Sequence, residues 1–177
     1  MTQTLRRIGI LAAAALLTTT FGLTHVYAAG TDEPAPPADS SKDKGGKKKS
    51  KSKKQSDAEF LRQYRVARAL ILAERYKEGI AAMHSLGQDQ HPDVANYIGY
   101  AYRKMGDFAD SRVWYEKALA ADPLHVRTWS YYGMWQMAQG RPDLALAYLD
   151  KVEAICGNKA CKEYRELYAV IEGRASY

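Results

Sequence analysis

The sequence is short of the residues and motifs on which catalysis usually depends. It has only two cysteines in 177 residues, and it has no glycine-rich loop of the kind that cradles phosphate groups. The scattered acidic residues form no constellation and suit solvated helix faces. The histidines beyond the N-terminal segment lie far apart in the sequence, which argues against a metal site: His84, His91 and His125. We therefore expect a chain that is not an enzyme and that holds no cofactor or metal.

No apolar run reaches the roughly 20 residues that span a bilayer comfortably. The one candidate, Ile8–Leu23, follows Arg6 and Arg7 and precedes tolerated cleavage-site residues that end at Ala28. This order of charge, apolar run and cleavage site predicts a secretory signal peptide over residues 1–28, cleaved near Ala28. An uncleaved anchor is the weaker alternative. The mature protein is then expected to be periplasmic or secreted.

Residues 29–57 contain no aromatic residue and no aliphatic residue larger than alanine. Such a segment has nothing to bury and cannot offset the entropy lost on ordering, so its composition predicts a disordered, lysine-rich linker. The linker holds eight lysines against five acids, whereas from Ala58 onward 16 basic residues face 15 acidic ones. Because the domain itself lacks a basic excess, nucleic acid is not an expected partner.

The domain at 58–177 shows helical spacing of apolar residues and none of the sustained alternation that a strand requires. Two of its glycines recur at one shared interval, since Gly99 and Gly106 return as Gly133 and Gly140. The first glycine of each pair falls within a helical pattern, and the second interrupts it. A period of about 34 residues predicts stacked helix pairs and directs the search toward a binding surface.

The repeated pattern resembles that of tetratricopeptide repeats, which is W-x2-L-G-x2-Y, then A-x3-F, then A and P. Here it reads A-x2-I-G-x2-Y, S-x3-Y, A, P over residues 95–123, and W-x2-Y-G-x2-Q, A-x3-L, V, G over residues 129–157. A degenerate unit precedes them, because the interval from Tyr76 to Phe108 is two residues shorter than the interval between the glycines. The resemblance implies an all-α solenoid of about three helix-turn-helix units, at about 59–91, 92–125 and 126–157, with a capping helix at 160–172. Its framework positions, expected in the core, hold Tyr102, Tyr115, Trp129 and Tyr132.

The resemblance also implies where a partner would bind, since in this family the first helix of each repeat lines a concave groove. The matching positions supply aromatic, methionine and arginine side chains, which suit a protein or peptide partner. Packing between neighbouring first helices is an equally weighted alternative for Tyr97 and Tyr131. A clamp for a C-terminal carboxylate is disfavoured, because these two tyrosines stand where such a clamp has Asn and Arg. The candidate groove residues are Tyr64, Arg68, Asn96, Tyr97, Tyr100, Arg103, Lys104, Arg127, Tyr131, Met134 and Met137.

The two cysteines, Cys156 and Cys161, bracket the turn between the last repeat and the capping helix. An even number of cysteines in an exported chain favours a disulfide. The intervening Gly157 and Asn158 suit the end of a helix, so a bridge here would fix the angle at which the cap docks. Free or redox-active thiols and metal ligation are the alternatives, but C-x-x-C spacing and further ligands are missing.

These features favour a non-catalytic adaptor or scaffold, exported to the periplasm, that binds a protein or peptide in the concave groove. The alternative function is association with an anionic membrane surface or envelope polymer through weak electrostatic contacts of the lysine-rich segment. Self-association through the less regular first repeat is a third hypothesis.

Overall fold

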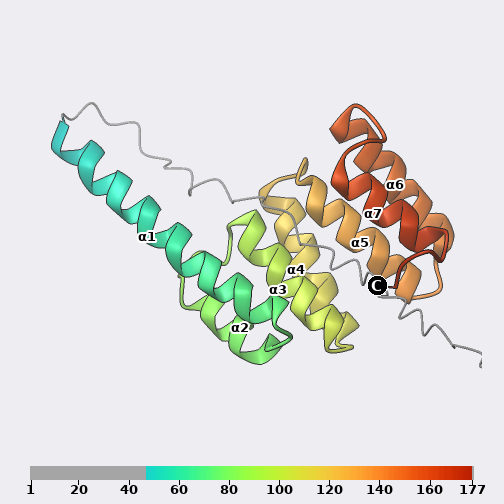
Figure 1. Ribbon diagram of the computed structural model, residues 1–177, viewed down its shortest axis with the longest axis horizontal. Helices are drawn as coiled ribbons and strands as arrows, with labels where there is room; N and C mark the ends of the chain where they lie inside the picture. The colour runs from blue at the N-terminus through green and yellow to red at the C-terminus, as the bar shows by residue number, and fades with distance from the viewer. Residues whose placement is uncertain (1–46, 177) are drawn as a thin grey trace, which may run out of the picture. The chain divides into compact units, whose positions relative to one another are not determined.

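A computed structural model describes residues 47–176, with side chains from residue 56 onward (Figure 1). All seven regular elements in this range are α-helices, so the expected all-α class is confirmed there. None of these helices combines the length and the apolar character needed to cross a bilayer. The predicted signal peptide and residues 29–46 of the predicted linker lie outside the described residues. The helices are α1 (Lys47–Leu72), α2 (Tyr76–His84), α3 (Pro92–Lys104), α4 (Phe108–Ala121), α5 (Val126–Ala138), α6 (Pro142–Cys156) and α7 (Lys162–Ile171).

Helix α1 begins earlier than the domain boundary predicted at residue 58. It starts at Lys47 and has 26 residues, whereas α3 and α5 have 13 each. The prediction of disorder rested on the lack of residues to bury. Lysine is nevertheless a good helix former, and extending an existing helix costs far less than nucleating one. The buried face at Phe60, Tyr64 and Ala67 anchors the helix, and residues 47–57 of the predicted linker are therefore helical.

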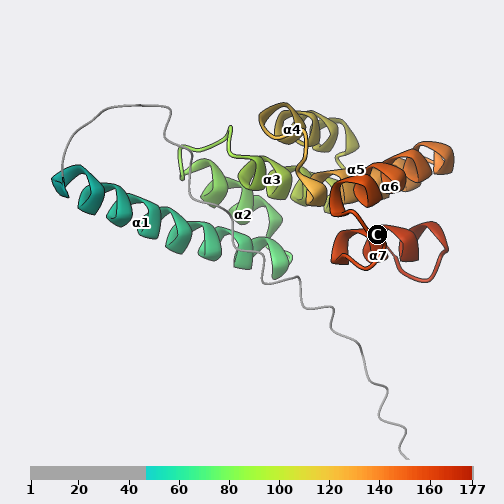
Figure 2. The same ribbon diagram turned by 90° about the horizontal axis from the view of Figure 1, so that it is seen from above.

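The helices are arranged in two layers. The helices pack in pairs: α1 with α2, α3 with α4, and α5 with α6. Contacts also join α1 to α3, α3 to α5 and α5 to α7, so these four helices form one continuous layer, which we call the inner layer. In Figure 2, α1 and α7 lie to the same side of α3 and α5, so the inner layer curves toward that side.

The recurring glycines of α3 and α5 allow neighbouring helices to approach closely. A Cβ atom on Gly99 would lie 2.8 Å from the Tyr115 ring, and one on Gly133 would lie 2.5 Å from Leu167. Real Cβ atoms essentially never lie this close to another atom. Tyr115 of α4 and Leu167 of α7 are fully buried at these points. The recurrence of glycine from one repeat to the next is therefore a packing requirement.

The turns inside the second and third helix pairs are built in the same way. Each has a glycine in the left-handed region, with φ 83° at Gly106 and 70° at Gly140. The N–H of the following residue then reaches back to a carbonyl in the last turn of the helix, as in common helix-ending motifs. These bonds join Asp107 to Tyr102 and Arg141 to Gln136, both at 2.9 Å.

The turn inside the first pair has the same backbone path without a glycine. Glu74 takes the place of the glycine with φ 63°, and it is the one non-glycine residue of the described chain with positive φ. The N–H of Arg75 donates to the carbonyl of Leu70 at 3.0 Å, which matches the bonds of the other two turns. The interval from Glu74 to Gly106 is two residues shorter than the interval from Gly106 to Gly140. The first repeat thus keeps the turn, and its irregular spacing arises from its shorter second helix, since α2 has 9 residues where α4 has 14.

Two of the four framework residues are less buried than expected. Tyr115 and Tyr132 lie in the core, with 0% and 7% of their surface exposed. Tyr102 and Trp129 are only half-buried. The indole N–H of Trp129 donates to the carbonyl of Pro123 at 2.9 Å. This bond holds the indole beside the α4–α5 connection at the edge of the core, which accounts for its exposure.

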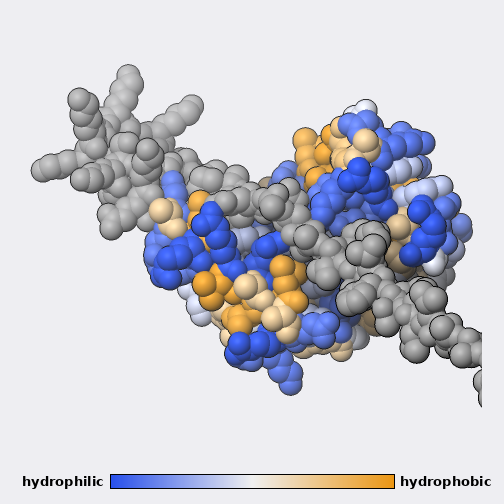
Figure 3. Space-filling view, in the orientation of Figure 1, coloured by the Kyte–Doolittle hydropathy of each residue, from blue (hydrophilic) through white to orange (hydrophobic). Residues whose placement is uncertain are grey.

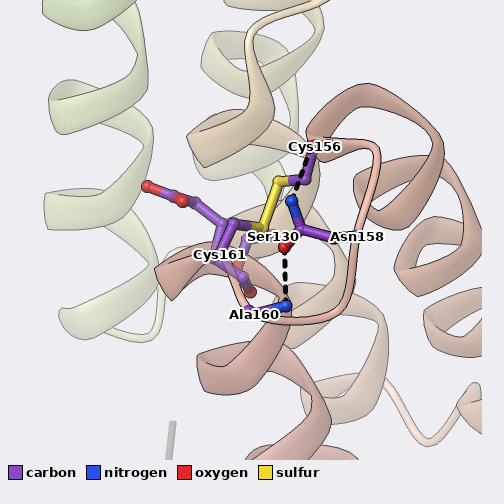
Figure 4. The surroundings of a disulfide bond; sticks show 6 residues. Ser130, Cys156, Asn158, Ala160 and Cys161 are labelled. Atoms are coloured by element: carbon purple, nitrogen blue, oxygen red, sulfur yellow. Dashed lines mark hydrogen bonds between the residues drawn. A yellow bond between two sulfur atoms is a disulfide. The ribbon is translucent and has the colours of Figure 1, made fainter.

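A disulfide holds the turn between α6 and α7, as the cysteine spacing predicted. The sulfurs of Cys156 and Cys161 are 2.13 Å apart (Figure 4), and the described residues contain no free cysteine. Gly157 ends α6 with φ 70°. Asn158 braces the loop by accepting from the N–H of Ala160 at 2.8 Å and donating to the carbonyl of Cys156 at 3.1 Å. The bridge therefore fixes the chain where it enters α7, which packs against α5 and α6.

Candidate partner-binding surface

A row of tyrosines crosses the inner layer from α1 to α5. The ring centroids are 6.0 Å apart for Tyr64 and Tyr97, 6.3 Å for Tyr97 and Tyr100, and 5.3 Å for Tyr100 and Tyr131. Residues three apart share a helix face, and the repeat period places equivalent positions of α3 and α5 side by side. The repeat therefore assembles these four residues, which we call the tyrosine row.

Three arginines lie against the tyrosine row. Arg68 of α1 donates from Nε to the Tyr97 hydroxyl at 2.6 Å, and its guanidinium is 5.5 Å from the ring. Arg127 of α5 lies 5.9 Å from the same ring, and Arg103 lies 5.5 Å from the ring of Tyr100. Contacts between cations and aromatic faces are worth about 0.5–2 kcal/mol each. The arginines thus help to hold the rings in place.

A buried carboxylate at the start of α3, that of Asp93, gathers three basic side chains. Its Oδ1 lies 2.8 Å from Arg127 Nη1 and 3.3 Å from His125 Nε2, and its Oδ2 lies 3.9 Å from His91 Nδ1. Burial alone would raise the pKa of Asp93, but the hydrogen bond of His125 and the neighbouring positive charges outweigh burial and lower the pKa. His91 and His125 are one repeat period apart, so the repeat brings together two histidines that looked unrelated in the sequence.

Two buried polar atoms of α1 and α3 have no hydrogen-bond partner: Oη of Tyr64 and Nδ2 of Asn96. The carbonyl oxygen of the Asn96 side chain is satisfied, since Thr128 Oγ1 donates to it at 3.0 Å. A buried donor without a partner costs about 1–3 kcal/mol.

Burial disfavours ionisation of three members of the tyrosine row. It raises the pKa values of Tyr64, Tyr100 and Tyr131 above the ordinary value of 10. These residues are therefore uncharged phenols at physiological pH. They present ring surface and hydroxyl groups, and the arginines beside them present planar cations. This combination suits recognition of a polypeptide more than proton transfer near neutral pH.

One helix pair of the chain matches a known family. Residues 92–125, which contain α3 and α4, match the sequence profile described as the tetratricopeptide repeat. Helices α3 and α4 therefore form a tetratricopeptide repeat. A search of curated proteins found no match for the chain.

One solved structure similar to this chain is described as the first TPR of Spaghetti (RPAP3) bound to the HSP90 peptide SRMEEVD. The TM-score is 0.54 and the sequence identity is 15%, over 65% of this chain and 91% of that chain. A likeness at this identity concerns the fold alone. It confirms the α-solenoid predicted from the sequence.

Most of the candidate groove residues are buried rather than open to a partner. Because large tyrosine and arginine side chains from adjacent first helices stack on one another, the packing interpretation holds for Tyr97 and Tyr131, which are 2% and 8% exposed. Arg68, Tyr100 and Met137 are half-buried, and Lys104 is exposed. The expectation that the whole set faces a partner is corrected for the buried members, which are Tyr64, Asn96, Tyr97, Arg103, Arg127, Tyr131 and Met134.

The capping helix α7 adds two acidic residues that the sequence analysis did not assign to the site. Glu163 is buried, and its carbonyl accepts from Ser130 Oγ of α5 at 2.9 Å. Glu166 is half-buried. After burial, the negative charge of Glu166 is among the influences that raise the pKa values of Tyr100 and Tyr131. The available signal was the spacing of three, which puts both acids on one side of the helix.

One group of described residues, Cys156, Cys161 and Glu163, has the short distances that metal ligands show. Both sulfurs are bonded to each other, however, so they do not present thiolates. The short distances therefore arise because Glu163 lies beside the disulfide, whose surroundings Figure 4 shows.

Hydrophobic residues also reach the surface away from the tyrosine row. Figure 3 shows such residues over the region of α1 and α2. On α1, Val66 and Leu72 are 55% and 39% exposed, and Val113 of α4 is 55% exposed. Self-association through the first repeat stays a prediction, and these residues of α1 are the ones that would test it.

Proposed function

We propose that this chain is an exported, non-catalytic adaptor that binds an extended segment of a partner protein across the inner layer. The observation that carries the proposal is the tyrosine row with its arginines. Within it, Arg68 and Tyr100 reach the surface while their buried neighbours hold them in position, and Met137 is a half-buried residue of α5.

The accessible residues have the chemistry of interface hot spots. Tyrosine, arginine and methionine are enriched where proteins bind one another. Tyr100 lies between Tyr97 and Tyr131, so its ring is positioned before a partner arrives and loses little freedom on binding. A peptide as the class of partner also agrees with the peptide complex among the similar structures.

Affinity capture with matched variants tests this proposal. The mature chain, immobilised, would be compared with Tyr100→Ala, Arg68→Ala and the control Tyr102→Ala. Tyr102 is a half-buried tyrosine of the same helix that does not belong to the tyrosine row. We expect the first two to weaken capture of a specific partner by at least about tenfold, as hot-spot residues do, with unchanged helicity. Equal capture by all three variants would remove the basis for this surface.

Export is tested separately, by finding where the chain accumulates and where it begins. The proposal expects a periplasmic or secreted protein whose N-terminus, read by mass spectrometry, follows cleavage near Ala28. A protein that retains Met1 or residues 2–28 and stays inside the cell would contradict export without affecting the binding surface.

A second candidate function, association with an anionic envelope surface, is favoured by the start of α1. The helix begins inside the lysine run and carries six lysines in its first eight residues. Each lysine near an anionic surface contributes about 1 kcal/mol. Sedimentation with vesicles that contain phosphatidylglycerol would test this. Binding should disappear at high salt and on replacement of the six lysines by glutamine; binding that survives both changes would exclude the lysine run as the cause.

A further inference from the structure

The capping helix α7 has few means of its own to stay folded. It has ten residues, fewer than the roughly 12–15 at which an isolated helix becomes even marginally stable in water. Its N-cap residue, Cys161, makes no side-chain capping hydrogen bond. The helix is therefore stable only while it is held against the rest of the domain.

The inner face of α7 covers part of the core of α5. Leu167 of α7 lies in one core cluster with Tyr131 and Met134 of α5. It also packs on the glycine of that helix, because a Cβ atom on Gly133 would lie 2.5 Å from it. Tyr131 and Met134 are only 8% and 7% exposed in this arrangement. Undocking of α7 would therefore remove the cover of Gly133 and open this part of the core to water.

The disulfide acts at the point where the chain enters α7. It joins Cys156, the last residue of α6, to Cys161, the residue before α7. Both cysteines are half-buried, and the four residues between them, 157–160, are exposed, so a small reductant can reach the bridge in the folded chain. In the chain-entropy account, opening a bridge over so short a loop favours the released state by a factor on the order of 30.

We propose that this bridge is a redox-sensitive latch, which keeps α7 docked on α5 when oxidised and lets it undock when reduced by a dithiol. One thiolate of the dithiol attacks a sulfur of the bridge, the S–S bond breaks, and the other cysteine leaves as a thiolate and takes up a proton. The second thiol of the reductant then displaces the first cysteine from the mixed disulfide. The chain gains two thiols, and the dithiol becomes a disulfide.

The redox-sensitive latch goes beyond the proposed function, because it concerns the docking of α7 whether or not a peptide binds the tyrosine row. The loop also offers a matched control. The side chain of Asn158 accepts from the N–H of Ala160 at 2.8 Å and donates to the carbonyl of Cys156 at 3.1 Å. Asn158→Ala removes both hydrogen bonds and leaves the bridge in place, so it separates the bracing of the loop from the bridge itself.

Hydrogen exchange read by mass spectrometry tests the inference on the mature chain with and without dithiothreitol, with free thiols counted by alkylation. We expect reduction to speed the exchange of the α7 amides by on the order of 30-fold. In the reduced chain α7 should exchange at least about tenfold faster than α3 and α4, because it opens without them. Anilinonaphthalene sulfonate, a dye that binds exposed apolar surface, should fluoresce more strongly with the reduced chain.

The variants separate the bridge from the loop. Replacement of Cys156 and Cys161 by Ser should give fast exchange of α7 with or without dithiothreitol, and Asn158→Ala should keep the slow exchange of the oxidised chain. The comparison of the unaltered chain before and after reduction decides the question even if the serine variant fails to fold.

Three results would overturn the inference. The first is slow exchange of α7 in a chain whose two thiols are both alkylated, and the second is a bridge that dithiothreitol leaves intact in the folded chain. The third is exchange of α7 together with α3 and α4 after reduction, because the bridge would then support the whole domain. Exchange of α7 as fast in Asn158→Ala as in the reduced chain would also contradict the latch, since the hydrogen bonds of the loop would then hold the helix.

Discussion

The turn of the first repeat allows a quantitative test of the fold, because Glu74 adopts φ 63° where the other two turns have glycine. The left-handed region costs an L-residue about 1–2 kcal/mol relative to glycine. Glycine loses part of this advantage, about 0.4–1 kcal/mol, through the greater freedom of the unfolded chain. We therefore expect Glu74→Gly to raise the free energy of unfolding by about 0.5–1 kcal/mol. The converse change, Gly106→Ala at φ 83°, should lower it by about 1 kcal/mol.

Urea unfolding followed by far-UV circular dichroism measures both variants. The midpoint should rise for Glu74→Gly and fall for Gly106→Ala while the m-value stays the same, because neither change alters the surface exposed on unfolding. In thermal melts, a change of about 1 kcal/mol should appear as a shift of Tm by about 3–5 °C for a domain of this size. If Glu74→Gly proved neutral or destabilising while Gly106→Ala destabilised, the two turns would not be equivalent and the reasoning would be refuted.

Three further variants follow from the packing and the electrostatics. Replacement of Cys156 and Cys161 by Ser should lower the free energy of unfolding by about 2 kcal/mol for so short a loop, and reductant should destabilise the unaltered chain but not the variant. Gly99→Ala should cost about 1–3 kcal/mol, because its Cβ would meet the Tyr115 ring; an unchanged melt would show that the helices separate freely. Because the pKa of Asp93 is lowered on folding, its ionised carboxylate stabilises the folded domain above about pH 4. This stabilisation is lost as the pH falls through the lowered pKa. Asp93→Asn should therefore lower the free energy of unfolding at neutral pH and weaken its dependence on pH in the acid range. The same acid dependence in the variant and the unaltered chain would contradict this.

The fold was largely predictable because a few residues impose it. The glycines at 99 and 133 cannot bear a Cβ against Tyr115 and Leu167, and those at 106 and 140 have positive φ. Each recurrence in the sequence therefore corresponds to a local requirement of the backbone. The first repeat was harder to place, because Glu74 fills the role of a glycine and leaves no such mark. The early start of α1 was missed because composition reports what a segment can bury, whereas a helix already nucleated at Phe60 and Tyr64 extends outward.

The candidate surface was predictable in position but not in exposure. Family positions located the tyrosine row, yet they could not tell that Tyr97 would be covered by Tyr64, Arg68 and Arg127. Exposure depends on the size of side chains from neighbouring helices, which a single-residue pattern does not contain. The cluster around Asp93 and the acids of α7 also escaped the sequence analysis, because they depend on contacts between elements that are far apart in the sequence.

Site-specific photo-crosslinking tests the central claim, that a partner binds across the inner layer. A photoreactive amino acid would replace Lys104, exposed on α3 of the inner layer, or Val113, exposed on α4 of the other layer. Irradiation of the mature chain with its partner should yield a crosslink from position 104, lost with Tyr100→Ala, and none from position 113. Crosslinks from position 113 alone, or crosslinks at position 104 that persist with Tyr100→Ala, would contradict the claim.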